Sequence, residues 1–387
     1  MESSRDQWAR TACGVVLACG GCGDAATPAS DATTDAGSST GDIGGASTGA
    51  ASSSSGPGDT GRGATTGAPS TSTGADAVDS GSGSSSGGTT GASVGPLQFV
   101  AVTFNTGGHA NGQADVADEW YGNGLAWLPA VEQTTAFLAD LKPDIIVFQE
   151  IFHSPDCVDI PAEFHAGYVC ETWTEGDPTV AQVILGEDYQ IACHLGKTDK
   201  CAAVKTTFGS FVGCDSAYCI EGLAGGMVED CGSGSRVGRG VVELERGGQL
   251  TLVNFHGTSG FLPDDQACRV GQVDQVFVDL DGEPGANGER NLVLGDFNTD
   301  PVRGVLLDVS AQRWNDFVGD EHPFHFITEV GANVQPTYAG TLNIDHQVSD
   351  AFDGQCWHPG ITAGYEGVVD FNYFDHVPAV CLLSVAE

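Results

Sequence analysis

The sequence predicts a mixed α/β fold for residues 96–387, and three observations favour it. Short runs rich in Val, Ile, Leu and Phe, which are typical of strands, alternate with segments whose apolar residues recur at helical spacing. Several of the strand-like runs end on a carboxylate, amide or imidazole side chain. Most of the cysteines lie in residues 153–235, where periodicity is weak, so we expect a disulfide-braced insertion there.

A strand, a helix and a second strand begin the domain. Residues 97–105, "LQFVAVTFN", are rich in β-branched and aromatic residues and predict a strand that ends at Asn105. Residues 126–142 carry apolar side chains near helical spacing, and the proline that follows stops the predicted helix. Residues 144–150, "DIIVFQE", predict a second strand that stays apolar almost to Glu150.

Further strands and helices follow the cysteine-rich stretch. Residues 238–256 contain two β runs joined at "RGG", which predicts a hairpin whose second strand ends at His256. The later elements are a helix at 263–280, a strand "NLVLGD" at 291–296, a helix near 303–317, more β segments and the terminal "FDHVPAVCLLSVAE". Strands and helices are therefore mixed along the whole domain.

The first 95 residues differ in composition from the domain. Residues 1–22 combine two arginines, a short apolar run and small residues, which predicts an export signal; an ordinary unstructured start is the alternative. The run is too short to span a membrane. It ends in "VLAC", which resembles a bacterial lipoprotein signal, so we expect a lipid anchor at Cys19. Residues 23–95 are nearly all Gly, Ser, Thr, Ala and Asp, which predicts a disordered linker.

The chain is strongly acidic, with 14 Lys and Arg against 52 Asp and Glu and a formal net charge of −38. A field of this sign repels phosphate backbones and anionic membrane surfaces unless cations intervene. The charge therefore disfavours nonspecific binding to nucleic acid, whereas a local patch or bound divalent ions still permit nucleic acid as a substrate.

Ten of the 13 cysteines lie in the domain, and their spacing does not form paired CxxC zinc motifs. An even number in this arrangement predicts disulfides, with zinc ligands and free thiols as alternatives. Disulfides need an oxidising compartment. We therefore expect an exported monomer without a transmembrane helix, either lipid-anchored at the envelope surface or secreted.

Polar side chains capable of metal binding or proton transfer stand at the ends of predicted β runs. They are Asn105, Glu150, His256, Asp296 with Asn298, and Asp375 with His376, the last two at the start of a run. Strand ends on one edge of a sheet would bring these residues together. Each has a plain alternative on its own, since "GDFN" is a favourable turn sequence and a lone histidine is usually structural. Their joint occurrence favours a site.

The strand-end residues divide into metal ligands and proton carriers. Carboxylate and amide oxygens suit a hard divalent cation, and we expect Mg²⁺, with Mn²⁺ and Ca²⁺ as alternatives. Asn105, Glu150 and Asp375 could supply that site. Histidines suit proton transfer because their pKa lies close to neutral pH. A metal combined with general bases indicates hydrolysis.

Six polar-ended segments follow one another along the domain, namely "TFN" (103–105), "FQE" (148–150), "VNFH" (253–256), "LGDFN" (294–298), "NIDH" (343–346) and "FDH" (374–376). In their order and rough spacing they resemble the landmarks of the endonuclease/exonuclease/phosphatase superfamily. The superfamily includes deoxyribonuclease-I-like nucleases, bacterial sphingomyelinases and inositol polyphosphate 5-phosphatases. The resemblance covers about residues 97–387 and implies a four-layer α-β-β-α sandwich, in which two packed mixed sheets are flanked by helices and the active site lies at one edge.

The resemblance also implies roles for individual residues. Glu150 corresponds to the principal metal ligand, assisted by Asn105 and Asp375. His376 corresponds to a general base or phosphate-contacting histidine, oriented by Asp345.

Three more residues would act on the water and the phosphate. Asp296 would position or deprotonate the attacking water, Asn298 would hold a phosphoryl oxygen, and His256 would stabilise charge or serve the leaving group. A phosphodiester is anionic and repels hydroxide, so a metal and a protonated imidazole must offset charge as the pentacovalent state forms. One departure is Phe374, which stands where the superfamily usually has a serine.

The expected function is that of an exported phosphoric ester hydrolase, a phosphodiesterase of nuclease or sphingomyelinase type. Its substrate would be nucleic acid or a phospholipid headgroup. The alternative, favoured by Phe374 and the cysteine-rich stretch, is a non-catalytic surface binding module on the same scaffold. Arg236 and Arg239 are candidate phosphate contacts, with a structural ion pair as the alternative, and His109 and His153 are candidates for the border of the site.

Overall fold

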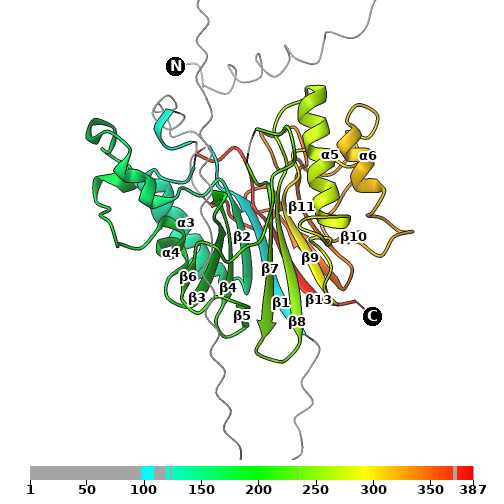
Figure 1. Ribbon diagram of the computed structural model, residues 1–387, viewed down its shortest axis with the longest axis horizontal. Coiled ribbons are helices and arrows are strands. Elements are labelled where there is room, and N and C mark those ends of the chain that lie inside the picture. The colour runs from blue at the N-terminus through cyan, green and yellow to red at the C-terminus, as the bar shows by residue number, and fades with distance from the viewer. Residues whose placement is uncertain (1–96, 109–118, 123, 233, 369–372, 387) are drawn as a thin grey trace, which may run out of the picture. The chain divides into compact units, whose positions relative to one another are not determined.

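Two β-sheets pack face to face, with helices on both outer faces, in the computed structural model of the chain (Figure 1). The structure describes residues 97–108, 119–122, 124–232, 234–368 and 373–386. The predicted export signal with Cys19, the predicted linker at 23–95, and His109 lie outside the described residues. The predicted mixed α/β sandwich of two packed sheets is confirmed.

The first sheet has seven strands in the order β12-β13-β1-β2-β4-β3-β6. These strands are β1 (Gln98–Asn105), β2 (Ile145–Gln149), β3 (Tyr189–His194), β4 (Lys197–Lys205), β6 (Tyr218–Cys219), β12 (Phe352–Trp357) and β13 (Ala379–Val385). Strands β1 and β2 run parallel, with Asn105 opposite Gln149 at their carboxyl ends. The residues that follow these two strands therefore meet at one edge of the sheet.

The second sheet has six strands in the order β10-β11-β9-β8-β7-β5. These strands are β5 (Gly209–Phe211), β7 (Val237–Leu244), β8 (Gln249–His256), β9 (Asn291–Asp296), β10 (His325–Phe326) and β11 (Asp345–Ser349). Strands β8 and β9 run parallel, with His256 opposite Asp296, and β11 runs antiparallel with Asp345 opposite Asp296. Three predicted site residues thus stand in one row across this sheet.

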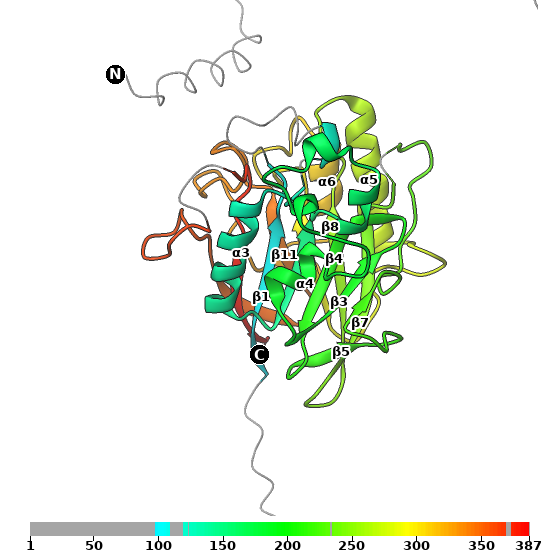
Figure 2. The same cartoon turned by 90° about the vertical axis from the view of Figure 1, so that its left-hand side faces the viewer.

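Helices cover the outer face of each sheet. Figure 2 shows α3 (Leu128–Leu141) and α4 (Val180–Leu185) over the seven-stranded sheet, and Figure 1 shows α5 (Pro263–Phe277) and α6 (Val309–Asn315) beside the six-stranded one. Three short 3-10 helices precede α4, namely η1 (Ser154–Val158), η2 (Ala162–Phe164) and η3 (Val169–Glu171). None of the helices in the described part of the chain has the length and apolar character needed to cross a bilayer.

Three apolar clusters fill the spaces between these layers. One lies under α3 and α4, one lies between the sheets, and one lies under α5 and α6. A polar connection also crosses between the sheets, where Gln149 Nε2 donates to Asn254 Oδ1 at 2.8 Å and Asn254 Nδ2 donates to the Phe148 carbonyl at 2.9 Å. Because both residues are fully buried, this connection fixes the relative position of β2 and β8.

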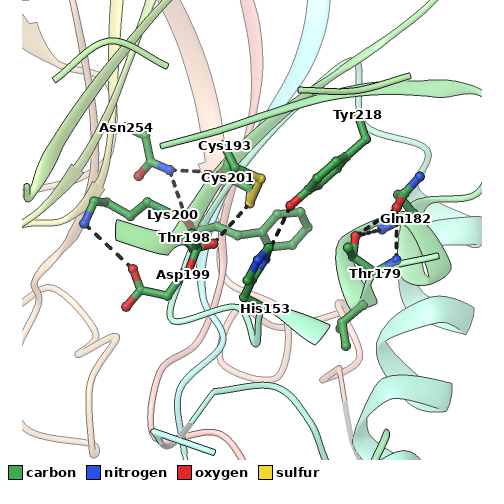
Figure 3. The surroundings of a disulfide bond; sticks show 12 residues. His153, Thr179, Gln182, Cys193, Thr198, Asp199, Lys200, Cys201, Tyr218 and Asn254 are labelled. Atoms are coloured by element: carbon green, nitrogen blue, oxygen red, sulfur yellow. Dashed lines mark hydrogen bonds and ion pairs between the residues drawn. A yellow bond between two sulfur atoms is a disulfide. The ribbon is translucent and has the colours of Figure 1, made fainter. Parts of the chain in front are cut away.

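The ten cysteines of the domain form five disulfides, as the sequence predicted. The pairs are Cys157–Cys170, Cys193–Cys201, Cys214–Cys219, Cys231–Cys268 and Cys356–Cys381. Figure 3 shows Cys193–Cys201, which joins directly opposed residues of β3 and β4. The cysteine-rich residues 153–235 are thus partly built into the sheets, since they supply β3 to β6.

The helix predicted near 303–317 is shorter than the periodicity suggested. Residues 301–307 form turns, and α6 begins only at Val309. Asp300 explains the difference, because its carboxylate accepts hydrogen bonds from the Arg303 backbone and side chain and holds the turn closed. Asp308 then caps α6 by accepting from the Ser310 backbone N–H.

His346 lies fully buried in β11, where one ring nitrogen is 3.0 Å from Thr328 Oγ1 and the other 2.9 Å from the Asn343 carbonyl. Burial lowers its pKa from 6.5 to about 4. The unfolded chain therefore binds more protons than the folded chain between these values, so stability falls as the pH drops from 6.5 towards 4. We expect this loss to reach about 3 kcal/mol.

The measurement is urea unfolding of the wild type and His346→Gln between pH 7.5 and 4. The variant should lose less stability over this range, because glutamine does not titrate. Equal slopes for both proteins would show that His346 does not cause the acid sensitivity.

Candidate active site

The predicted site residues lie together at the edge where β1, β2, β8 and β9 end. Asn105 Nδ2 donates to Asp296 Oδ2 at 3.0 Å across the gap between the sheets, although 191 residues separate the two in sequence. The same Asn105 nitrogen lies 3.4 Å from His376 Nε2 and 3.5 Å from Glu150 Oε1. The strand-end residues therefore come together as expected, but from two facing sheets rather than from one.

Asp296 is the most buried carboxylate of the site, with no exposed surface. Its Oδ1 accepts the Asn298 backbone N–H at 2.7 Å, and its Oδ2 accepts the Asn298 and Asn105 side-chain amides. Burial, together with the nearby Asp345, raises the pKa of Asp296 to about 7, although these hydrogen bonds and His376 oppose the shift. Near neutral pH this group can therefore accept a proton as well as orient a water.

His376 is held by Asp345, as predicted. Its Nδ1 lies 2.9 Å from Asp345 Oδ2, and its Nε2 points to Asp296 Oδ2 at 3.6 Å. Burial alone would lower the pKa of this imidazole, but Asp345 and Asp296 outweigh it and raise the pKa to about 10. His376 is therefore a protonated imidazole near neutral pH, fixed in orientation by one carboxylate.

His256 has a different electrostatic environment. Its Nε2 lies 3.4 Å from Glu150 Oε1 and 3.8 Å from Asp296 Oδ2, while its buried Nδ1 has no hydrogen-bond partner among the described residues. Burial lowers its pKa well below the ordinary value, and the positive charges of Arg236 and Lys200 lower it further. The site thus contains one charged and one neutral imidazole, which suits two separate proton-handling tasks.

Glu150 follows β2 in a left-handed backbone conformation, with φ of 57°. This conformation is uncommon for a residue with a side chain and is often found where a site constrains the backbone. Gly107 faces the carboxylate so closely that a Cβ on this residue would lie 1.9 Å from Glu150 Oε2. A side chain at this position would therefore push the Glu150 carboxylate out of its present place.

The residues predicted as metal ligands fit a hard divalent cation. Glu150 and Asp375 keep part of their side chains exposed, at 30% and 38%, so their oxygens are accessible. Burial raises the pKa of Glu150, and the negative charges of Asp375 and Asp199 raise it further, although His376 and Asn105 oppose the shift. A cation would relieve this repulsion, and carboxylate and amide oxygens are the donors that Mg²⁺ and Mn²⁺ prefer.

Asp296, Asp345 and His376 also lie close enough to share an ion, with donor atoms within 4.8 Å of one another. A protonated imidazole has no lone pair for a metal, however, and His376 Nδ1 is already bonded to Asp345. This group therefore suits proton handling, and the open side of Glu150 suits a metal.

The two arginines named from the sequence have different surroundings. Arg239 forms a surface ion pair with Glu283 and is therefore a structural residue rather than a phosphate contact. Arg236 lies beside the site, where its Nη1 donates to the Gly257 carbonyl at 3.3 Å and its Nε is buried without a partner among the described residues. Lys200 is fully buried nearby, with Nζ 3.9 Å from Asp199 Oδ1 (Figure 3). Burial lowers the pKa of Lys200 well below its ordinary value, although Asp199 opposes the shift, so Arg236 is the more firmly charged of the two basic groups on the His256 side.

A cavity of about 280 Å³ opens beside Glu150. Its lining includes Trp120, Tyr121, Phe152, His153, Asp156 and Asp199. His153, which the sequence placed at the border of the site, lines this cavity, and its Nδ1 lies 3.5 Å from Tyr218 Oη (Figure 3). The cavity next to Glu150 is therefore lined by acidic and aromatic side chains.

The structure adds residues that the sequence did not single out. Tyr338 packs its ring 4.7 Å from the His376 ring, and Gly107 leaves room for the Glu150 carboxylate. The glycine pair after "TFN" was a readable signal, since adjacent glycines often mark a close approach of the backbone to another group.

Asn298, predicted to hold a phosphoryl oxygen, donates its side-chain amide to Asp296 and to the Gly257 carbonyl. Phe374, at the serine position, packs against Phe104.

No family model matches the sequence, and no curated protein matches it significantly. Similar solved structures include an endonuclease/exonuclease/phosphatase family protein from Bacteroides thetaiotaomicron, with 12% identity, coverage of 75% of this chain and 96% of that chain, and a TM-score of 0.46. TDP2 from D. rerio, complexed with a single-strand DNA product, has 11% identity, coverage of 74% and 98%, and a TM-score of 0.46. The human Nocturnin catalytic domain, with bound sulfate, has 13% identity, coverage of 75% and 94%, and a TM-score of 0.45. At these identities the likeness concerns the fold alone.

Proposed function

We propose that the chain is a divalent-metal-dependent phosphoric ester hydrolase, and specifically a phosphodiesterase. The observation that carries the proposal is the pairing of Asp296, with a pKa of about 7, and protonated His376, 3.6 Å apart and next to the open carboxylate of Glu150. A basic carboxylate, a fixed cationic imidazole and a metal-binding carboxylate are the groups that phosphoester hydrolysis needs. The ordered sequence motifs support the same reaction class.

The protein's own groups divide the reaction between them. Asp296, held by two asparagine amides, orients the attacking water and accepts its proton. His376, fixed by Asp345, donates a hydrogen bond to a phosphoryl oxygen as negative charge develops. His256, with Arg236 and Lys200 behind it, stabilises charge on the leaving oxygen.

Glu150, Asp375 and the Asn105 side-chain oxygen would hold the cation. When bound there, a divalent ion would supply Lewis-acid stabilisation of the phosphoryl oxygens and of the leaving group. Gly107 supports this assignment, because a side chain at residue 107 would displace the Glu150 carboxylate.

Export of the chain is part of the proposal, and so is lipid attachment at Cys19. Five disulfides support export, because such bonds persist in oxidising compartments and are rare in the cytosol.

The test is hydrolysis of bis(p-nitrophenyl) phosphate by the purified full chain. We expect turnover with Mg²⁺ or Mn²⁺, complete loss with excess EDTA and recovery when the metal is restored. Turnover that persists after the protein has been stripped of metal would contradict the metal dependence. A folded protein that is inert with every divalent metal would support the binding-module alternative.

A further inference from the structure

Two loops at the site edge carry an exposed apolar surface, which we term the apolar rim. It consists of Phe261, Leu262, Val302, Leu306, Leu307 and Val309. Leu306, Leu307 and Phe261 have the largest exposed fractions among large apolar side chains of the described residues, at 88%, 85% and 74%. Soluble proteins seldom gather such residues on one surface without a binding role.

A buried arginine holds the two loops of the apolar rim together. Arg269 has no exposed surface, and its Nη1 donates to the carbonyls of Thr258 and Gly260 on the first loop. Its Nη2 donates to Asp308 Oδ2 at 2.8 Å on the second loop. Such a fully hydrogen-bonded buried ion pair holds both loops in defined positions. The exposed side chains are therefore presented on an ordered support.

Gln266 of α5 brings the apolar ends of these loops side by side. Its Nε2 donates to the Phe261 carbonyl at 3.0 Å, and its Oε1 accepts the Val309 backbone N–H at 3.2 Å. Figure 1 shows α5 and α6, whose first residues follow these loops, lying next to each other. The two loops that carry the six apolar side chains are thus held next to each other.

The two loops that carry the apolar rim begin at the candidate active site. The first loop follows His256 directly, and the second follows Asn298. Asn298 Nδ2 donates to the Gly257 carbonyl at 3.0 Å, which joins the starts of the two loops. A partner that covers the apolar rim therefore lies close to the catalytic edge.

The charges near the apolar rim indicate what kind of partner fits it. Asp264 and Asp265 stand in the first turn of α5, two and three residues after Leu262. The cations of the two loop regions are already paired, Arg269 with Asp308 and Arg303 with Asp300. This surface would repel an anionic membrane or a nucleic acid and would attract an ammonium headgroup.

The lining of the cavity beside Glu150 would also attract an ammonium group. Asp156 and Asp199 line it, and its lysine, Lys197, is paired with Asp199 at 2.6 Å. Aromatic side chains complete the lining, and aromatic rings with carboxylates are a common environment for ammonium groups.

We propose that the apolar rim is a docking surface for a zwitterionic lipid membrane, which it contacts with the two loops while the headgroup phosphate reaches the site. Hydrolysis of the lipid phosphate rests on the proposed function. Docking on the membrane does not depend on it. Aliphatic and aromatic side chains inserted at the headgroup boundary bind in proportion to the apolar area that they bury.

The test measures binding of the full chain, carrying Cys19→Ser so that no lipid is attached there, to phosphatidylcholine vesicles by flotation. We compare Leu306→Ser/Leu307→Ser with Val212→Ser/Val278→Ser. The control residues are also exposed, at 54% and 49%. Val212 follows β5, which pairs with the half of β7 away from the site edge, and Val278 follows the end of α5 opposite to Leu262. The rim variant should bind about tenfold more weakly or worse, and the control variant should bind like the parent.

Hydrolysis of bis(p-nitrophenyl) phosphate separates docking from chemistry, since this soluble substrate needs no membrane. The rim variant should cleave it at the parental rate. Rim-dependent vesicle binding without any hydrolysis would support the docking surface and contradict the proposed function. The docking proposal is overturned if the parent does not bind vesicles, or if the control variant loses as much vesicle binding as the rim variant. It is also overturned if the parent binds phosphatidylglycerol vesicles more strongly than phosphatidylcholine vesicles. Dimers in sedimentation that depend on the rim, without vesicle binding, would overturn it as well.

Discussion

His376→Ala should lower the rate of phosphodiester hydrolysis by about 10³-fold, because it removes the charged donor that faces Asp296 across the site. Asp345→Asn should cost less, since it leaves the imidazole in place but removes the carboxylate that holds the proton on it. The measurement is kcat/KM for bis(p-nitrophenyl) phosphate with saturating Mn²⁺.

His325→Ala is the matched control, since His325 lies in β10 and pairs with Asp353 outside the site. It should retain parental activity. All three variants should unfold cooperatively, which would show that any lost activity is not lost folding. Parental turnover by folded His376→Ala would remove this histidine from the mechanism.

Glu150→Gln should abolish the stabilisation of the folded chain by Mg²⁺ or Mn²⁺ and reduce activity by at least about 10²-fold. A ligand that binds only the folded state at 100 times its Kd adds about 2.7 kcal/mol of stability, and this increment should vanish in the variant. With EDTA the variant should be as stable as the parent, since burial already disfavours the charged carboxylate.

Thermal unfolding with and without metal makes this measurement independent of turnover. Glu187→Gln, which replaces an exposed carboxylate before β3, should keep the full metal increment. If the Glu150 variant also keeps it, the ion binds elsewhere, and the group formed by Asp296, Asp345 and His376 becomes the alternative location.

The positions of the main site residues were predictable from the sequence for a physical reason. An apolar run that stops at a polar side chain marks the end of a buried strand, and parallel neighbours end at the same edge. Asn105, His256 and Asp296 were found in this way, and the structure places each at the last position of its strand. Glu150 follows β2 directly.

Features that depend on pairing between distant segments were not predictable. Lys200 reads as a surface lysine in "KTDKC", yet the opposing sheet buries it completely. Leu306 and Leu307 fit a helical pattern that suggested packing, whereas the turn closed by Asp300 directs them to solvent. Neither outcome follows from local propensity, because tertiary contacts decide which face is covered.

The two halves of the site stand on different sheets, with Glu150 after β2 and Asp296 in β9, and the buried bond between Gln149 and Asn254 joins those sheets. During folding, neither sheet alone can assemble a working centre, however complete its own hydrogen bonding. Recovery of catalysis after denaturation therefore reports the docking of one sheet on the other, a late and long-range event, and secondary structure should return before turnover does.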